Sequence, residues 1–215
     1  MSKICIFDFD GTLADSIVSI AYFANKTMEE YGYGAIDSKT MMSFVGNGAK
    51  KQMERVIAYH NADVSIDEVL PNYLEKYRSN PSYLLEPFDG IKEMLDKLKA
   101  GGVKVSVLSN KPHNLTVSLL DTVFGKDYFY KPFGQMEGKK TKPDPSVVYE
   151  IIDGYEKDDC WMIGDSDVDI ITGHNAGIHT IGVLWGYRPE EVIRSANPEF
   201  TVRTPDEIVS CLRGI

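Results

Sequence analysis

The sequence of 215 residues is poor in cysteine, with only three: Cys5, Cys160 and Cys211. Their number is odd, their spacing is wide and they form no Cys-x-x-Cys pair, so a disulfide framework is not expected. Free thiols are typical of a reducing compartment, and we therefore expect a cytoplasmic protein. Cys5 and Cys160 lie in or beside apolar runs, where we expect them to pack as small buried side chains.

Long apolar runs and positive charge are also scarce. The apolar start, Ile4 to Phe7, is interrupted by Asp8 and is too short for a signal peptide. No run approaches the roughly 18 residues that a membrane span needs. The 23 Lys and Arg are outnumbered by 32 Asp and Glu, for a formal net charge of −9. Because phosphate-backbone binding needs a cationic face, we do not expect nucleic acid as a partner. With no apolar run long enough to span it, we do not expect a membrane either. A small anionic substrate stays possible, because a metal ion and local lysines can override net charge.

Several signatures of other enzyme classes are missing. The sequence contains no GxxxxGK[ST], GxGxxG, GxSxG or HExxH pattern. The run from Asp165 begins like a calcium-binding loop, but Ile170 stands where glycine is required and Ala176 where the bidentate glutamate belongs. The histidines are scattered. Chemistry is therefore to be sought among the carboxylates.

One stretch near the N-terminus, residues 3–13, organises the rest of the chain. The apolar run Ile4 to Phe7 predicts a buried strand. Asp8 and Asp10 follow immediately, and a buried strand has no use for carboxylates. They should therefore lie where the strand ends, which is the edge at which open α/β sheets bind ligands.

The periodicity of the chain predicts an α/β fold with a helical insertion. Apolar residues recur at helical spacing over 16–31, over 38–62 with a break at 46–48, and over 66–78. From residue 87 onward, strand and helix patterns alternate, which implies a parallel sheet with right-handed crossovers. The length and the apolar fraction of 43% suit one domain with an insert.

The expected boundaries follow from these patterns. A discontinuous core would comprise residues 1–14 and 86–215, and an all-helical domain residues 15–85, with hinges near 13–15 and 85–88. The strands are expected at 4–7, 103–108, 128–133, 160–163, 180–184 and 200–202. The later helices are expected at 91–100, 115–122, 145–155, 167–176 and 205–212.

Polar side chains follow several of the predicted strands and should meet at one edge of the sheet. Asp8 and Asp165 are hard oxygen ligands that suit magnesium, which typically takes one or two carboxylates plus a substrate phosphate. Ser109 can donate to a phosphoryl oxygen, and Lys142 adds a fixed positive charge. Asp8 could then attack phosphorus to form an aspartyl-phosphate, while Asp10 protonates the leaving oxygen and later activates water.

These residues resemble the four motifs of the haloacid dehalogenase superfamily. The matching segments are 8–12 (Asp-Phe-Asp-Gly-Thr), Ser109 after a strand, Lys142 before a proline, and 164–169 (Gly-Asp-Ser-Asp-Val-Asp). The order of the motifs also matches, and the resemblance covers nearly the whole chain. It implies a Rossmann-like parallel sheet core with a mobile, all-helical cap domain inserted after the first strand.

The resemblance also implies roles for individual residues. Asp8 would be the nucleophile, Asp10 the acid and base, and Ser109 and Lys142 the phosphate-binding residues. Magnesium would be held by Asp8, by the backbone carbonyl of Asp10 and by Asp165. Asp169 would support the metal site through water.

Within the superfamily, the chain most resembles the phosphoglycolate phosphatases. The supporting segments are 11–16, 46–48 and 109–112. One departure is the stretch 88–90 (Phe-Asp-Gly) in the second hinge, where many relatives carry proline before the glycine. Phosphatases of pyrophosphate, nucleotides and sugar phosphates share most of these segments and stay as alternatives. A phosphomutase and a catalytically silent module that binds a phosphometabolite are further alternatives.

Substrate contacts are expected from both parts of the chain. Thr12 and Asn110 would contribute from the core. From the helical domain we expect Gly46, Asn47, Gly48 and Lys50, since loop amides can reach an anion. A simple helix break at 46–48 and a solvated helix face at Lys50 are the alternatives. The partner would be a small phosphorylated metabolite, and the chain a monomer or weak homodimer.

Overall fold

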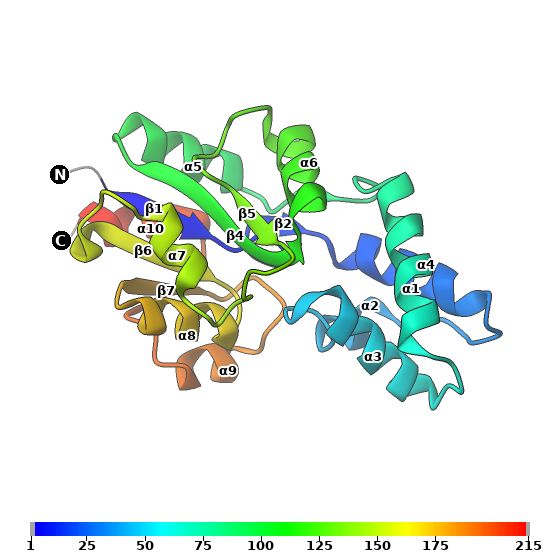
Figure 1. The fold of residues 1–215 in the computed structure, drawn as a ribbon. Coiled ribbons are helices and arrows are strands. Elements are labelled where there is room, and N and C mark those ends of the chain that lie inside the picture. Colours follow the sequence, from blue (N-terminus) through cyan, green and yellow to red (C-terminus); the bar gives the residue numbers. More distant parts are fainter. Residues whose placement is uncertain (1–2, 214–215) are drawn as a thin grey trace.

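A six-stranded parallel sheet forms the centre of the computed structural model, which describes residues 3–213 (Figure 1). The strand order is β5-β4-β1-β6-β7-β8. The bounds are β1 (Ile4–Phe7), β4 (Lys104–Pro112), β5 (Phe133–Gln135), β6 (Cys160–Gly164), β7 (His179–Val183) and β8 (Phe200–Val202). The first strand, β1, lies in the interior of the sheet and pairs with β4 on one side and β6 on the other.

Helices cover both faces of the sheet. Figure 1 shows α5 and α6 on one side and α7, α8 and α9 on the other, and α10 packs against α5. The bounds are α5 (Ile91–Ala100), α6 (His113–Phe124), α7 (Ser146–Ile151), α8 (Asp167–Ala176), α9 (Glu190–Ser195) and α10 (Pro205–Arg213), with a 3₁₀ turn at Lys157–Asp159.

The side chains of β1 show why this strand is an unbroken apolar run. Cys5 and Phe7 belong to the apolar cluster that includes side chains of α5, α6 and α10. Ile4 and Ile6 belong to a second cluster on the other face, formed with α7 and the end of α8. Successive side chains of a strand point to opposite faces, so a strand covered on both faces must be apolar at every position.

The residues between β1 and the rest of the sheet form a separate group of four helices, here called the helical segment. The helices are α1 (Ile17–Glu29), α2 (Ser38–Met42), α3 (Gly48–His60) and α4 (Ile66–Ser79). Two short strands, β2 (Ala14–Asp15) and β3 (Glu86–Pro87), pair antiparallel where the chain leaves the core and returns to it. The two connections between the core and the helical segment therefore lie side by side.

The predicted α/β fold is confirmed, but the prediction of a strand at 128–133 is wrong. The strand at this edge, β5, begins only at Phe133. Asp127 and Lys131 both have positive φ, which breaks the extended conformation before it can pair. Tyr128 and Phe129 pack instead against one another and against Phe124 of α6. Their aromatic character reflects this packing and not a strand.

Two further features differ from the prediction. Strand β4 continues to Pro112, four residues beyond the predicted end, and the short helix α9 was not predicted. Within residues 3–213, no helix is long and apolar enough to cross a membrane, and the three cysteines are free thiols.

Candidate active site

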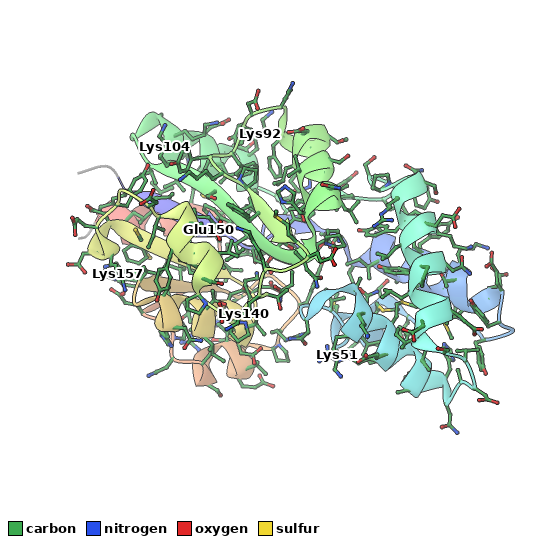
Figure 2. All side chains as sticks on the ribbon, in the orientation of Figure 1. Lys51, Lys92, Lys104, Lys140, Glu150 and Lys157 are labelled. Carbon is green, nitrogen blue, oxygen red and sulfur yellow. The ribbon has the colours of Figure 1, made fainter. Side chains whose placement is uncertain are left out.

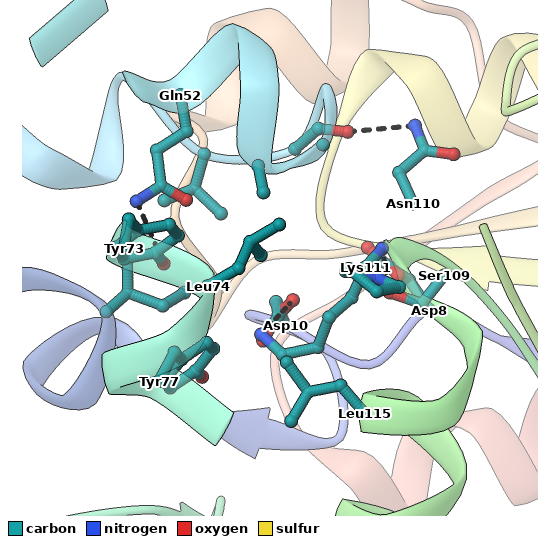
Figure 3. Close-up of a pocket in the computed structure, with 16 residues that line it drawn as sticks. Asp8, Asp10, Gln52, Tyr73, Leu74, Tyr77, Ser109, Asn110, Lys111 and Leu115 are labelled. Atoms are coloured by element: carbon teal, nitrogen blue, oxygen red, sulfur yellow. Dashed lines mark hydrogen bonds and ion pairs between the residues drawn. The ribbon is translucent and has the colours of Figure 1, made fainter. Parts of the chain in front are cut away.

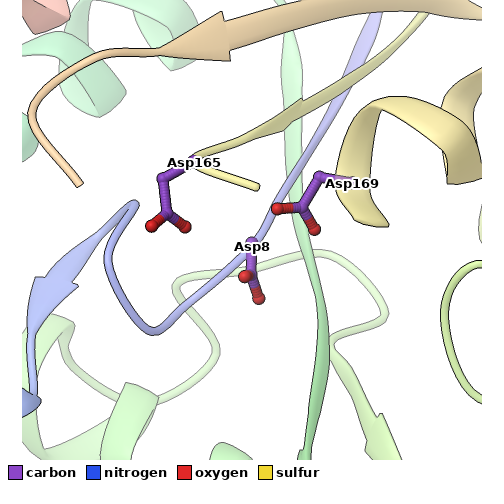
Figure 4. A group of neighbouring side chains, drawn as sticks. All are labelled: Asp8, Asp165 and Asp169. Atoms are coloured by element: carbon purple, nitrogen blue, oxygen red, sulfur yellow. The ribbon is translucent and has the colours of Figure 1, made fainter. Parts of the chain in front are cut away.

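The predicted site residues meet at one edge of the sheet. Asp8 directly follows β1, Ser109 lies near the end of β4, and Asp165 directly follows β6. Lys142 comes from the loop before α7. All four residues are buried. Figure 4 shows the carboxylates of Asp8 and Asp165 directed toward a common space with Asp169, which lies in the first turn of α8.

The ammonium of Lys142 lies between two of these carboxylates. Its Nζ is 2.9 Å from Asp8 Oδ1 and 2.6 Å from Asp169 Oδ1. Burial alone would lower the pKa of Lys142, but Asp169 and Asp8 outweigh it and hold this pKa above its ordinary value. Asp8 Oδ1 also accepts a hydrogen bond from the backbone N–H of Phe9, at 2.7 Å. Among residues 3–213, the polar contacts of the Asp8 carboxylate thus fall on Oδ1, and Oδ2 makes none.

Asp169 is held from both sides. Its Oδ2 accepts hydrogen bonds from the backbone N–H and the hydroxyl of Ser166, and the bond from the N–H is one half of the capping box of α8. Its Oδ1 contacts Lys142. The side chain is fully buried and fixes the position of the Lys142 ammonium.

Asp165 is fixed by two donors from distant parts of the chain. Its Oδ1 accepts a hydrogen bond from the Thr12 hydroxyl at 3.1 Å, and its Oδ2 accepts one from the Tyr187 backbone N–H at 2.7 Å. Glycines make these approaches possible. A Cβ at Gly11 would lie 2.4 Å from Asp165 Oδ2, and one at Gly164 would lie 2.2 Å from the Asp169 carboxyl carbon. A larger residue at either position would displace a carboxylate.

The three carboxylates carry more negative charge than Lys142 balances. One oxygen of each of Asp8, Asp165 and Asp169 lies within 4.8 Å of the others. Burial raises the pKa of Asp8 well above its ordinary value, with Lys142 opposing and the neighbouring carboxylates adding to the rise. Burial and then Asp169 raise the pKa of Asp165 to about 7. Hard oxygen donors with unbalanced charge fit a divalent cation.

Asp10 does not join this carboxylate cluster. Its Oδ1 accepts a hydrogen bond from the Ser16 hydroxyl at 2.5 Å, and Lys111 Nζ lies 3.0 Å from Oδ1 and 3.1 Å from Oδ2. Asp10 could therefore contribute to a metal site only through its backbone carbonyl, which is the contact that the family resemblance implies. Its carboxylate faces a cavity between the sheet edge and the helical segment.

The cavity is where a substrate would lie. Figure 3 shows Asp8, Asp10 and Ser109 along its core side, with Gln52 of α3 and the tyrosines of α4 opposite. Gly46 and Gly48, for which the sequence predicts substrate contact, also line it. A Cβ at Gly48 would lie 3.3 Å from the carbonyl oxygen of Asn110, and its φ is +84°, so glycine permits this close approach of loop and strand.

Of the other four residues predicted to contact substrate, Asn110 lines the cavity, and Thr12, Asn47 and Lys50 lie outside its lining. The Thr12 hydroxyl donates to Asp165. The Asn47 side chain accepts a hydrogen bond from Arg55 Nη2 at 2.8 Å. Lys50 is exposed on α3, like its neighbour Lys51 (Figure 2), and lies outside the cavity lining.

Asn110, the fourth, lines the cavity, but its amide is used by the protein itself. Its Nδ2 donates to the carbonyl oxygens of Gly46 and Lys142, and its Oδ1 accepts from the Lys142 backbone N–H. Asn110 thereby joins the loop of the helical segment to the loop that carries Lys142.

Sequence reasoning missed several residues at this site. Lys111 lies two positions after Ser109, and on an extended strand such residues point to the same side, so the true length of β4 would have revealed it. Gln52 and Tyr77 line the cavity from the helical segment. Arg188 donates through Nη1 to the Met42 carbonyl at 2.7 Å and through Nη2 to the Val45 carbonyl. No pattern in the sequence marked Arg188.

Comparison with known proteins identifies the family to which this chain belongs. A family model described as haloacid dehalogenase-like hydrolase matches residues 5–183. The chain belongs to this family. Phosphoglycolate phosphatase of Aquifex aeolicus is 31% identical over 212 residues, which cover 98% of this chain and 96% of that protein. Phosphoglycolate phosphatase of Neisseria gonorrhoeae is 30% identical over 216 residues, covering 97% and 89%.

The fold is shared with solved structures. The crystal structure of a predicted phosphoglycolate phosphatase from Haemophilus somnus 129pt superposes with a TM-score of 0.91 and covers 98% of this chain and 97% of that one. At 23% identity this likeness concerns the fold alone. The predicted family, and the prediction that the chain is an enzyme of the phosphatase class similar to phosphoglycolate phosphatases, are confirmed.

The raised pKa of Asp165 predicts how stability depends on pH without metal. An unfolded chain releases this proton near the ordinary value of 3.8, whereas the folded protein keeps it to about pH 7. Stability should therefore fall as pH rises through this window. Asn cannot ionise, so the Tm of Asp165→Asn should fall less than that of the wild type between pH 5 and pH 7.5 in chelator. The two decreases should differ by at least about 3 °C. The exposed substitution Asp153→Asn serves as the control. Parallel curves for wild type and Asp165→Asn would contradict the assignment.

Proposed function

We propose that the protein is a magnesium-dependent phosphomonoester hydrolase that acts on a small phosphorylated metabolite of the phosphoglycolate type through an aspartyl-phosphate at Asp8. The observation that carries this proposal is the position of Lys142 Nζ, 2.9 Å from Asp8 Oδ1 at the edge of a cavity lined by Ser109. A phosphate placed there would meet a nucleophile, an ammonium and a hydroxyl donor at once.

In the first half of the reaction, Asp8 Oδ2 attacks phosphorus and forms a P–O bond as the bond to the ester oxygen breaks. Asp10 gives a proton to the leaving oxygen, so that an alcohol departs. Lys142 and the Ser109 hydroxyl hold the phosphoryl oxygens and stabilise the charge that they carry. The electrons of the broken bond stay with the leaving oxygen.

In the second half, water attacks the phosphorus of the aspartyl-phosphate. Asp10 accepts a proton from that water, the P–O bond to Asp8 breaks, and inorganic phosphate is released. Asp8 leaves as a carboxylate whose Oδ1 keeps its contacts with Lys142 and the Phe9 N–H. Both steps use the same pair of aspartates in reversed roles.

Asp8, Asp165 and the backbone carbonyl of Asp10 would hold the magnesium ion. When bound, magnesium supplies positive charge that offsets the repulsion between the carboxylates and the incoming phosphate. Both oxygens of Asp169 are engaged by Ser166 and Lys142, so we assign Asp169 to positioning Lys142 and to indirect support of the metal.

We propose that residues 15–85 act as a cap domain over a core made of residues 1–14 and 86–215. The paired strands β2 and β3 would serve as the hinge. Closure would bring Gln52, Tyr73 and Tyr77 over the substrate and exclude water, and opening would release product. Arg188 and Asn110 hold the loop before α3 by its carbonyl oxygens and would favour the closed arrangement.

The relatives that bear the name phosphoglycolate phosphatase make phosphoglycolate the first substrate to test. We further propose a cytoplasmic enzyme, in keeping with its free cysteines, that works as a monomer or weak homodimer. Pyrophosphate, nucleotides and sugar phosphates belong in the same substrate panel as alternatives.

The nucleophile is tested by phosphate release over that panel, with magnesium and with chelator. We expect release only with magnesium, and a loss in kcat of at least about a thousandfold in Asp8→Asn. The variant should fold at least as stably as wild type, because it removes a buried charge whose ionised form the site disfavours. Asp153→Asn is the exposed control. Substantial turnover by Asp8→Asn, or turnover unaffected by chelation, would contradict the mechanism.

The role of Asp10 separates chemistry from metal binding. Asp10→Asn should lower kcat by about a hundredfold or more, since it cannot transfer the proton. The magnesium concentration that gives half-maximal activity should change little, because only the Asp10 backbone is assigned to the metal. A large rise in that concentration with unchanged kcat at saturating magnesium would reverse the assignment.

A substitution at Arg188 tests whether its hydrogen bonds to the stretch before α3 contribute to substrate binding. Arg188→Met removes two hydrogen bonds from a charged donor to the Met42 and Val45 carbonyls. We expect kcat/KM to fall about tenfold, mainly through KM, since closure over the substrate would be weakened. Arg194→Met, at an exposed arginine of α9, should match wild type. An unchanged KM in Arg188→Met would show that the loop does not depend on this contact.

A further inference from the structure

Lys111 is a buried charge at the site that the proposed chemistry does not use. It lies on β4, on the same side as Ser109, and only 7% of its surface is exposed. Its Nζ is 3.0 and 3.1 Å from the two oxygens of Asp10 (Figure 3). An ammonium has three N–H donors, so the two oxygens of Asp10 leave one donor for another acceptor.

Tyr77 provides a second, independent sign of a ligand at this place. It reaches the cavity from α4, is 2% exposed, and its ring centroid lies 4.7 Å from Lys111 Nζ. Within residues 3–213, its hydroxyl lies near Lys111 and Ser19 but makes no hydrogen bond of ordinary geometry with either. Buried hydroxyls are normally paired, so an orphaned hydroxyl beside an ammonium indicates that an acceptor from the substrate completes the pair.

The position of Asp10 sets how far this acceptor lies from the reacting phosphate. Asp10 must reach the leaving oxygen to protonate it, and Lys111 is hydrogen-bonded to Asp10 itself. Lys111 Nζ is 3.0 Å from one oxygen of the same carboxylate, so it lies within two hydrogen-bond lengths of the leaving oxygen that Asp10 would protonate. A group that meets Lys111 while the phosphate meets Ser109 must therefore be attached very near the ester oxygen.

The remaining walls of the cavity restrict the substrate further. Ile20, Leu74 and Leu115 are apolar and surround the same space. Among the described residues that line the cavity, Lys111 is the only cationic one. The acceptor is thus expected to be a compact anion next to the ester and not a long polar chain.

We propose that Lys111 and the Tyr77 hydroxyl bind a carboxylate carried by the carbon next to the ester oxygen, and so select phosphorylated 2-hydroxy acids as substrates. This inference rests on the proposed function, because it places the phosphate between Asp8, Ser109 and Lys142. Specificity for the substrate would then depend on β4 of the core and α4 of the helical segment together.

The test compares phosphoglycolate with its carboxamide, which has the same shape without the second charge. Lys111→Met should reduce kcat/KM for the acid by about 10- to 100-fold more than for the amide. Tyr77→Phe should reduce the ratio of kcat/KM for the acid to kcat/KM for the amide several-fold. Lys111→Arg should retain part of the wild-type preference for the acid. Lys99→Met is the matched control, because Lys99 also lies over a tyrosine ring, at 3.4 Å from the Tyr128 centroid, but far from the cavity.

Equal losses for acid and amide in Lys111→Met would overturn the proposal, since they would show that Lys111 acts only by positioning Asp10. A Lys111→Met variant that loses activity toward neither compound would overturn it as well. A preference of the wild type for a substrate with a second phosphate, lost in Lys111→Met, would also overturn the carboxylate assignment.

A binding measurement keeps the two hypotheses apart. Calorimetry with magnesium should show that 3-phosphonopropionate, which cannot be hydrolysed, binds wild type more tightly than propylphosphonate, and that Lys111→Met removes the difference. If the wild type hydrolyses no ester, the proposed function fails, but this pair of ligands still decides whether the subsite exists. If the protein hydrolyses neutral esters and shows no preference between the two phosphonates, the function stands and the subsite is wrong.

Discussion

The burial of three carboxylates around a single ammonium is the constraint on which the rest of this structure depends. Asp8 and Asp169 share Lys142, and Asp165 lies close enough for like charges to repel. Such a group is costly in a protein interior unless hydrogen bonds fix its carboxylates. The capping box of α8, the Thr12 hydroxyl and the N–H of Tyr187 all meet that need. Much of the surrounding backbone can therefore be understood as a support for this charge.

The second feature of the site is its division between two parts of the chain. The sheet edge carries the groups proposed for bond making and breaking, whereas α3 and α4 form the opposite wall of the cavity. Asn110 and Arg188 connect the two by donating to backbone carbonyls of the loop before α3. Since these contacts are to backbone, the side chains of that loop can vary without loss of the connection.

The amino-acid sequence predicted the core of this site because its residues lie at the ends of clear apolar runs. Asp8 and Asp165 each follow a strand buried on both faces, so their unusual position was visible without coordinates. Lys111 was missed because it depends on how far β4 extends, which its sequence alone does not mark. The position of Tyr187 is set by its contact with Asp165, 22 residues away, which no local pattern encodes. The Asn47 side chain is held by Arg55 of the helix that it begins. The strand predicted at 128–133 failed for the related reason that aromatic residues suit a strand and a helix-packed loop equally well.

The pairing of β2 with β3 has a consequence for how such a protein can diversify. The chain leaves the core at Ala14 and returns at Pro87 as directly paired neighbours, at a separation of about 5 Å between Cα atoms. The covalent connection therefore constrains only the two ends of the intervening segment, and the further contacts from Asn110 and Arg188 are to its backbone carbonyls. Whole segments could be exchanged at this point, by recombination or by design, while the buried charges stay in place. A single inherited mechanism could in this way be combined with many different recognition surfaces.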